Sequence, residues 1–209
     1  MTISSQTGWW LEDPSETARE NPYTFWLPSA SVIEALAPGN QVKLIFCFDS
    51  DDPDAPRAER MWVTVDDVAG NGFRGRLDNE PKHMTQIRIG DAVEFEARHI
   101  INTDIEDPSA ESFARFFKRC FVTHRILEAG EKPGYVYREP PDRDDDSGWR
   151  FLVGDESDEY MDDAINTSYV AVGAVLNLDP TLIEIYEESE GQWWWNEPAG
   201  SWQKIEDGL

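Results

Sequence analysis

The dipeptide Asn71-Gly72 is the feature that most constrains how this chain can fold. Both residues tolerate positive φ, which the two central positions of a tight hairpin turn require. The segments on either side, MWVTVDD and FRGRLDN, are rich in β-branched and aromatic residues and predict two antiparallel strands. Two further segments, QVKLIFCFD and AVEFEARHI, also have strand character. We therefore expect three to five antiparallel strands in the first hundred residues.

Short helices are predicted where a capping residue precedes apolar residues at helical spacing. Ser29 or Ser31 can cap a helix through SVIEALA, and Asp107 followed by Pro108 suits the start of another. In the second half, FVT, GYVYRE and WRFLV predict strands, DESDEYMDDA predicts a short helix, and SYVAVGAVL is apolar enough to be buried. The segment LIEIY fits a strand or a helix.

These patterns together predict an α+β fold of mainly antiparallel strands with a few short helices, in two small halves packed together. We expect an N-terminal arm over residues 1–20, with Trp9 and Trp10 docked on the body. A mostly β domain is expected over residues 21–106, a connecting helix over 107–120 and an α+β domain over 121–209.

The charge of the chain restricts its partners. The 209 residues include 42 Asp and Glu against 18 Lys and Arg, a net charge of −24. Such a surface repels phosphate backbones and anionic lipid, so neither nucleic acid nor a membrane is an expected partner. No apolar run approaches the roughly 20 residues of a membrane-spanning helix. A basic protein, by contrast, would be attracted.

The N-terminal sequence and the cysteines predict a cytoplasmic protein. The first residues have neither the basic region nor the apolar region of a secretory signal. Cys47 and Cys120 both lie in apolar segments, where we expect buried free thiols, as in a reducing compartment.

No cofactor is predicted, although the glycines of residues 70–75 fit the pattern G-x-G-x-x-G. A dinucleotide site needs those glycines between a strand and a helix, and here they lie within a predicted hairpin. No nucleophile elbow, P-loop or paired Cys-His signature is present. Paired carboxylates occur often in so acidic a chain, so we predict no catalytic residue.

The acidic loop at residues 142–146 is the best candidate for a metal, and it fits poorly. Asp142, Asp144 and Asp146 match the first three ligand positions of an EF-hand, but Ser147 and Val153 stand where glycine and glutamate are required. The three histidines share no metal-ligand spacing: His83, His99 and His124. No metal ligand is therefore predicted, while a weak cation site of another kind and a solvated acidic turn both stay open.

The run QWWWN places three large aromatic side chains in succession. In an extended segment Trp193 and Trp195 face one side and Trp194 the other. Tryptophan packs in cores and at seams, and it is also enriched at protein interfaces and on sugar-binding platforms. Trp194 is therefore a candidate aromatic anchor.

Two sets of motifs carry a family resemblance. YVYREPP, then DSGWRFLVGDESDEYMDDAIN, then NLDPTLIEIY resemble a bacterial family, first catalogued as uncharacterised, of immunity proteins from polymorphic toxin systems. In the first half, TFWLPS, VKLIF, ERMWVTV, GRLDNEP, GDAVEF and HI resemble an uncharacterised bacterial domain that often accompanies it. The resemblance implies a small cytosolic protein that neutralises a toxin by binding it, and it carries no catalytic residues.

We therefore expect a non-enzymatic binding protein without a cofactor, whose partner is a toxin with a basic surface. Charge complementarity would speed that association. The predicted partner-binding residues are Asp144, Asp145, Asp146, Asp155, Glu156, Glu159 and Trp194.

Three alternatives accompany this expectation. The chain could be a regulatory domain that binds a small ligand or sugar through its tryptophans, or a metal-dependent hydrolase that uses the acidic loop. The stretch DSGW could also serve structure alone, as a turn fixed by side-chain hydrogen bonds with Trp149, Phe151 and Tyr160 buried beneath it.

Overall fold

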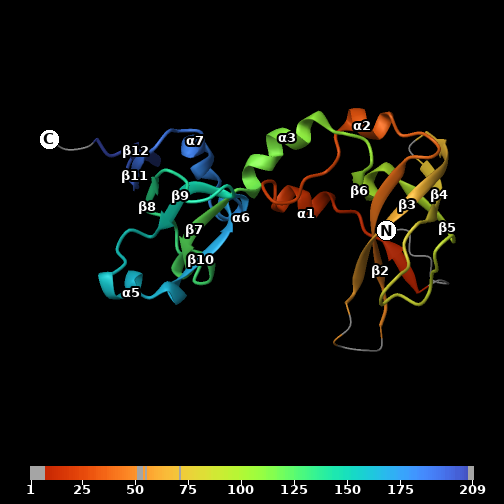
Figure 1. The fold of residues 1–209 in the computed structure, drawn as a ribbon, viewed down its shortest axis with the longest axis horizontal. Coiled ribbons are helices and arrows are strands. Elements are labelled where there is room, and N and C mark those ends of the chain that lie inside the picture. Colours follow the sequence, from red (N-terminus) through yellow and green to blue (C-terminus); the bar gives the residue numbers. More distant parts are fainter. Residues whose placement is uncertain (1–7, 51–53, 55, 71, 207–209) are drawn as a thin grey trace. The chain divides into compact units, whose positions relative to one another are not determined.

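A computed structural model describes residues 8–50, 54, 56–70 and 72–206 of the chain. Its contacts divide the chain into two compact units (Figure 1). The first unit comprises the described residues up to Glu20 together with Phe25–Glu111, and the second comprises Asn21–Thr24 and the residues from Ser112 onwards. Each unit contains one mainly antiparallel sheet and several short helices, so the predicted α+β class is confirmed.

The sheet of the first unit has six strands: five lie within the first hundred residues, as expected, and the sixth begins at Ile100. Its order is β1-β2-β3-β4-β5, and β6 also pairs with β2, all antiparallel. The long strand β2 accommodates β1 beside its second half and β6 beside its first half. The strands are β1 (Trp9–Leu11), β2 (Gln41–Phe48), β3 (Ala58–Ala69), β4 (Gly72–Leu77), β5 (Ala92–Glu96) and β6 (Ile100–Thr103).

The predicted hairpin joins β3 to β4, with its turn one residue earlier than expected. Ala69 pairs with Gly72, so Gly72 is the first residue of β4. Gly70 takes the first turn position, with φ of +62°, and Asn71 lies outside the described residues. This register places alternate apolar residues of both strands in the core, and a shift of one residue would expose them.

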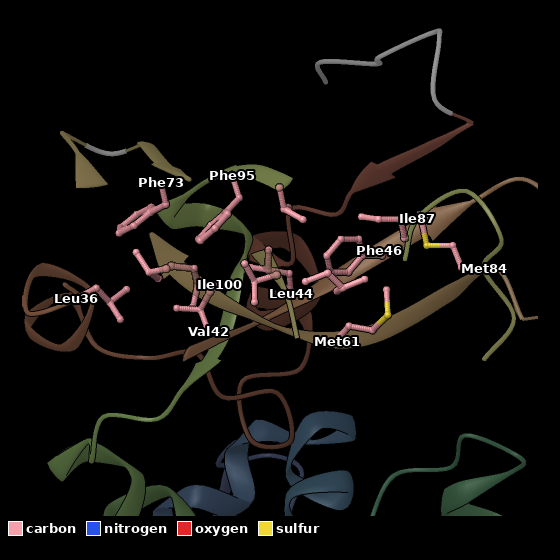
Figure 2. Packing of buried hydrophobic residues seen from close by; sticks show 14 of the residues in the cluster. Leu36, Val42, Leu44, Phe46, Met61, Phe73, Met84, Ile87, Phe95 and Ile100 are labelled. Carbon is pink, nitrogen blue, oxygen red and sulfur yellow. The ribbon is translucent and has the colours of Figure 1, made fainter. Parts of the chain in front are cut away.

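The core of the first unit lies on one face of its sheet (Figure 2). Val42, Leu44 and Phe46 alternate along β2 with less buried neighbours and are inaccessible to solvent. Phe73 and Phe95 stack with their ring centroids 5.2 Å apart, and Figure 2 shows them side by side. Trp9 of β1 packs against Phe46, so this part of the expected arm adds a strand to the sheet.

Two helices of the first unit, α2 and α3, begin directly after residues that were predicted to cap them, whereas α1 lies within the expected arm. Ser29 precedes α2 as its N-cap, and Asp107 precedes α3. Asp107 Oδ1 accepts hydrogen bonds from the backbone N–H and the hydroxyl of Ser109, at 2.9 and 2.7 Å, and Oδ2 accepts one from Ser29 N–H at 2.7 Å. The helical elements of the first unit are α1 (Ser15–Glu20), α2 (Ala30–Glu34), the 3-10 turn η1 (Ala97–His99) and the start of α3 (Pro108–Ala114). The 3-10 turn η2 (Arg115–Phe117), which follows α3, belongs to the second unit.

The helix after Asp107 is shorter than the expected range of 107–120. It ends at Ala114, η2 follows, and Lys118 is extended. Cys120 belongs to the next strand, where its side chain is fully buried. The apolar spacing that suggested a longer helix therefore combines one helical face with the first core position of a strand.

The sheet of the second unit has six strands in the order β10-β7-β9-β8-β11-β12. β7 and β9 are parallel, and the other neighbouring strands are antiparallel. The strands are β7 (Arg119–Thr123), β8 (Tyr135–Arg138), β9 (Asp146–Leu152), β10 (Thr167–Ala171), β11 (Gly191–Asn196) and β12 (Ser201–Lys204).

Helices of the second unit cover one face of this sheet. Val175, Leu176 and Ile185 pack in one buried cluster with the strand residues Val122 and Phe151. The segment LIEIY, which fitted either structure, is helical. The helical elements are α4 (His124–Leu127), α5 (Asp158–Asp162), η3 (Ala164–Asn166), α6 (Val172–Leu178), η4 (Pro180–Leu182) and α7 (Ile183–Tyr186). Within the part of the chain that the structure describes, no helix has the length and apolar character to cross a membrane.

Candidate functional site

The second sheet has a face that its core helices do not cover. Side chains alternate across a strand, so residues between core positions point to the opposite side. Phe121 lies between buried Cys120 and Val122, and Tyr135 and Tyr137 flank buried Val136. The residues on this side, most of them half-buried, form what we call the open face: Phe121, Tyr135, Tyr137, Arg150, Leu152, Tyr169, Gln192 and Trp194.

Strand register arranges the open face in two rows. The first crosses all the central strands, and the second lies nearer the end of β9. Phe121 and Tyr169 have ring centroids 4.8 Å apart, and Tyr135 and Tyr137 are 5.9 Å apart. The first row is Tyr169, Phe121, Arg150, Tyr137 and Gln192, and the second is Leu152, Tyr135 and Trp194.

Arg150, in the middle of the open face, is buried and neutralised. Its terminal nitrogens donate to both carboxylate oxygens of Asp146, at 3.0 and 2.8 Å, and its Nε donates to Glu139 at 2.8 Å. The guanidinium lies 5.0 Å from the ring centroid of Phe121. The hydrogen bonds from Arg150 hold the pKa of Asp146 well below its ordinary value, so the pair stays ionised.

Asp146, one of the predicted partner-binding residues, has a structural position. Its side chain is 0% exposed, and besides Arg150 it accepts hydrogen bonds from the backbone N–H of Gly148 and Asp142. The structural reading of DSGW therefore describes this residue: its side chain fixes the loop, and Trp149 and Phe151 are buried, whereas Tyr160 is only half-buried. The stretch forms the start of β9 instead of a turn, and we leave Asp146 out of the surface proposed below.

Asp144 and Asp145 are exposed on the acidic loop before β9. Asp145 Oδ1 accepts a hydrogen bond from the Tyr169 hydroxyl at 3.1 Å, so the loop borders the first row of the open face. Lys118 donates to the backbone oxygen of Asp144, and Arg143 lies 5.0 Å from the Tyr169 ring centroid. Positive charges thus accompany the acids at this end of the sheet.

Asp155, Glu156 and Glu159 lie at the other end of β9, in what we call the acidic segment, residues 153–166. A strand rises about 3.3 Å per residue, so roughly 20 Å separates the two ends. The predicted acids therefore form two groups and no single cluster. Asp155 binds Arg125 at 2.5 Å, and Glu159 is exposed in the first turn of α5.

Glu156 holds the acidic segment against the sheet. Its carboxylate accepts hydrogen bonds from the backbone N–H of Val153 and Gly154, at 2.8 and 2.7 Å, and from the Thr123 hydroxyl at 3.0 Å. Burial raises the pKa of Glu156, but these hydrogen bonds outweigh it and the net shift is downward. Thr123 follows Val122 in β7 and so points to the side of the open face.

The three consecutive tryptophans alternate across β11 as expected for an extended segment. Trp193 is 2% exposed and lies in the core beside Trp149, at 5.2 Å between ring centroids. Trp195 packs against Trp202 near the edge of the same core. Trp194 is 43% exposed and belongs to the open face.

Sequence reasoning missed most of the aromatic residues of the open face. Phe121, Tyr135 and Tyr137 fall at alternate positions of the strands predicted from FVT and GYVYRE. Tyr169 lies in β10, in the segment SYVAVGAVL, for which only burial was predicted. Alternation shows that they face away from their buried neighbours, but only the positions of α6 and α7 show which face is covered.

Metal-ligating side chains, thiols and the glycine pattern are the other features that could carry chemistry. No group of three or more metal-ligating side chains occurs among the described residues. Burial raises the pKa of the Cys47 and Cys120 thiols, so neither is a thiolate at neutral pH. The glycine pattern at residues 70–75 lies in the β3-β4 hairpin, with no helix following it.

The fold and this surface define an α+β protein of two units, the second with an aromatic sheet face bordered by acids. Residues 120–206 match the family model described as the Immunity protein Imm33 domain. Residues 12–107 match a second model, described as an uncharacterized protein conserved in bacteria (DUF2314). The two-part resemblance inferred from the sequence motifs is therefore confirmed. Comparison with curated proteins and with solved structures finds no match.

Proposed function

We propose that this chain is an immunity-type protein that neutralises a bacterial toxin by binding it, without catalysing a reaction. The observation that carries the proposal is the match of residues 120–206 to an immunity protein domain. That range contains every strand of the second sheet except the first residue of β7, and it contains the whole open face.

Charge supports a basic toxin as the partner. The chain has a net charge of −24, and complementary charge speeds encounter and disfavours partners of the wrong sign. Among the predicted residues, Asp144, Asp145, Asp155 and Glu159 are exposed, and Trp194 supplies a large, exposed aromatic group. We propose Asp155, Glu159 and Trp194 as contacts with the toxin, and Asp144 and Asp145 as acids that add to its long-range attraction.

Co-expression with toxins encoded beside the gene tests this function. We expect one of them to be captured by the tagged chain and to lose its effect on growth. In vitro, toxin activity should fall in proportion to added chain and reach zero at a fixed molar ratio, with the toxin mass unchanged. Turnover of the toxin by substoichiometric chain, or a complete lack of capture and protection, would rule the proposal out.

A matched pair of variants adds a control for charge. Asp144→Asn, Asp145→Asn and Glu159→Gln together should slow association with the captured toxin and reduce its salt dependence. Glu20→Gln, Glu34→Gln and Glu80→Gln change the net charge equally at exposed positions of the first unit. This second triple variant should bind nearly as the parent does, because it leaves every acid of the second unit in place.

A further inference from the structure

We propose that the toxin docks on the open face at the end where β9 finishes, with an apolar anchor on the second row and a basic patch against the acidic segment. This inference rests on the proposed function and names the surface and the chemistry of the partner.

The charge of the second sheet is unequal at its two ends. The acidic segment contains six Asp and Glu and no Lys or Arg: Asp155, Glu156, Asp158, Glu159, Asp162 and Asp163. Arg125 nearby is already held by Glu131 and Asp155, at 2.6 and 2.5 Å. At the other end, Lys118, Arg119 and Arg143 accompany the acidic loop. A basic patch is therefore attracted mainly to the α5 end.

The acidic segment is continuous with the open face. Glu156 binds Thr123 on that side of β7, and Gly154 packs against Tyr135, where an added Cβ would lie 3.0 Å from the Tyr135 Cβ. Tyr135 pairs with both Leu152 and Trp194 in the second row. One partner surface can thus reach the acids and the aromatic row together.

Exposed apolar groups gather toward the same end. Trp194 is 43% exposed, Met161 37% and Ile165 71%. Met161 and Ile165 lie between two residues that bind each other, because the Tyr160 hydroxyl donates to Asn166 O and Asn166 Nδ2 donates to Tyr160 O. Aromatic anchors surrounded by polar residues are typical of the groups that dominate binding energy at protein interfaces.

The open face is also preorganised for a basic partner. The Tyr135 hydroxyl donates to Gln192 at 2.8 Å, which fixes the ring in the second row. The positive charge of Arg150 is neutralised by Asp146 and Glu139, so the centre of the face does not repel cations. A second copy of the chain, with the same net charge of −24, would be repelled from it.

Binding kinetics of the captured toxin test the inference. Trp194→Ala should raise the dissociation rate about 30-fold, as loss of an interface anchor does. Asp158→Asn, Glu159→Gln and Asp162→Asn together should lower the association rate about tenfold at low salt and flatten its salt dependence. The matched triple Asp142→Asn, Asp144→Asn and Asp145→Asn, at the other end of β9, should lower that rate by less than about threefold.

Capture of the toxin with unchanged kinetics in Trp194→Ala and in the α5 triple would place docking elsewhere and overturn the inference, while the proposed function would stand. A larger effect of the loop triple than of the α5 triple would also overturn it. Light scattering of the free chain gives a further check: a dimer that Trp194→Ala dissociates would assign this face to a second copy. If no toxin is captured, the proposed function and this inference fall together.

Discussion

Individual carboxylates that look alike in the sequence have opposite roles in this protein. Asp144 and Asp146 are two residues apart, but the first is exposed and the second neutralises buried Arg150. Glu156 and Glu159 differ in the same way, because Glu156 accepts hydrogen bonds from two backbone N–H groups. Glu59 is a further structural acid, binding the backbone N–H of Lys82, His83 and Met84.

Substitution of the two aspartates should separate these roles. Asp146→Asn removes one partner of a buried ion pair and should lower the free energy of unfolding by about 3 kcal/mol. The buried guanidinium of Arg150 then loses one of the two carboxylates that neutralise its charge. Asp144→Asn should change it by less than about 0.5 kcal/mol. Urea denaturation followed by circular dichroism measures both. Equal stabilities for the two variants would contradict the structural role of Asp146.

The lowered pKa of Asp107 predicts that the stability of the protein falls in acid. Burial raises the pKa of Asp107, but hydrogen bonds from Ser29 and Ser109 outweigh this and lower it from 3.8 to about 2. A depressed folded-state pKa stabilises above the unfolded value and loses that effect as pH falls through the folded value. The difference in unfolding free energy between the parent and Asp107→Asn should therefore have its full value at pH 6 and shrink between pH 4 and pH 2. A difference that is constant over this range would refute the assignment.

At the scale of single elements, β11 shows how the alternation of side chains gives neighbouring residues of one strand different roles. Trp193→Ala opens a cavity in the core and should cost about 3 to 5 kcal/mol of unfolding free energy. Trp194→Ala, at an exposed position, should cost less than about 1 kcal/mol. Thermal denaturation compares the two variants. A large loss of stability in Trp194→Ala would show that its side chain supports the fold.

The start of β9 depends on a glycine. Gly148 has φ of +80°, and a Cβ there would lie 2.1 Å from the backbone oxygen of Glu139 in the neighbouring segment. Gly148→Ala should therefore lower the unfolding free energy by about 3 kcal/mol, combining backbone strain with overpacking. Gly130→Ala is the control, with φ of +72° and open space around it, and should cost only about 1 kcal/mol. Equal losses of unfolding free energy in the two variants would show that backbone strain, and not overpacking, causes the loss.

At the scale of the whole molecule, net charge acts on folding and on binding with opposite signs. A charge of −24 opposes the compact state through self-repulsion, and salt screens this. Raising NaCl from about 10 mM to about 300 mM should therefore raise Tm. The same change should slow association with a basic toxin. Calorimetry and binding kinetics over one salt series test both signs, and a falling Tm would mean that attractive ion pairs dominate.

The sequence by itself determined the local features of this protein. Turn residues and alternation located the hairpin and most strands, and Asp107 with Pro108 located the start of α3, because these preferences act within a few residues. The motifs also determined the two-part family resemblance.

Only the tertiary structure decided which residues meet. The burial of Asp146 and Glu156 depends on Arg150 and on strand neighbours, and the open face depends on α6 and α7 covering the opposite side of the sheet. Pairing between strands distant in the sequence places Phe121, Tyr135 and Trp194 on one surface, because register is fixed by packing the core and not by any single segment.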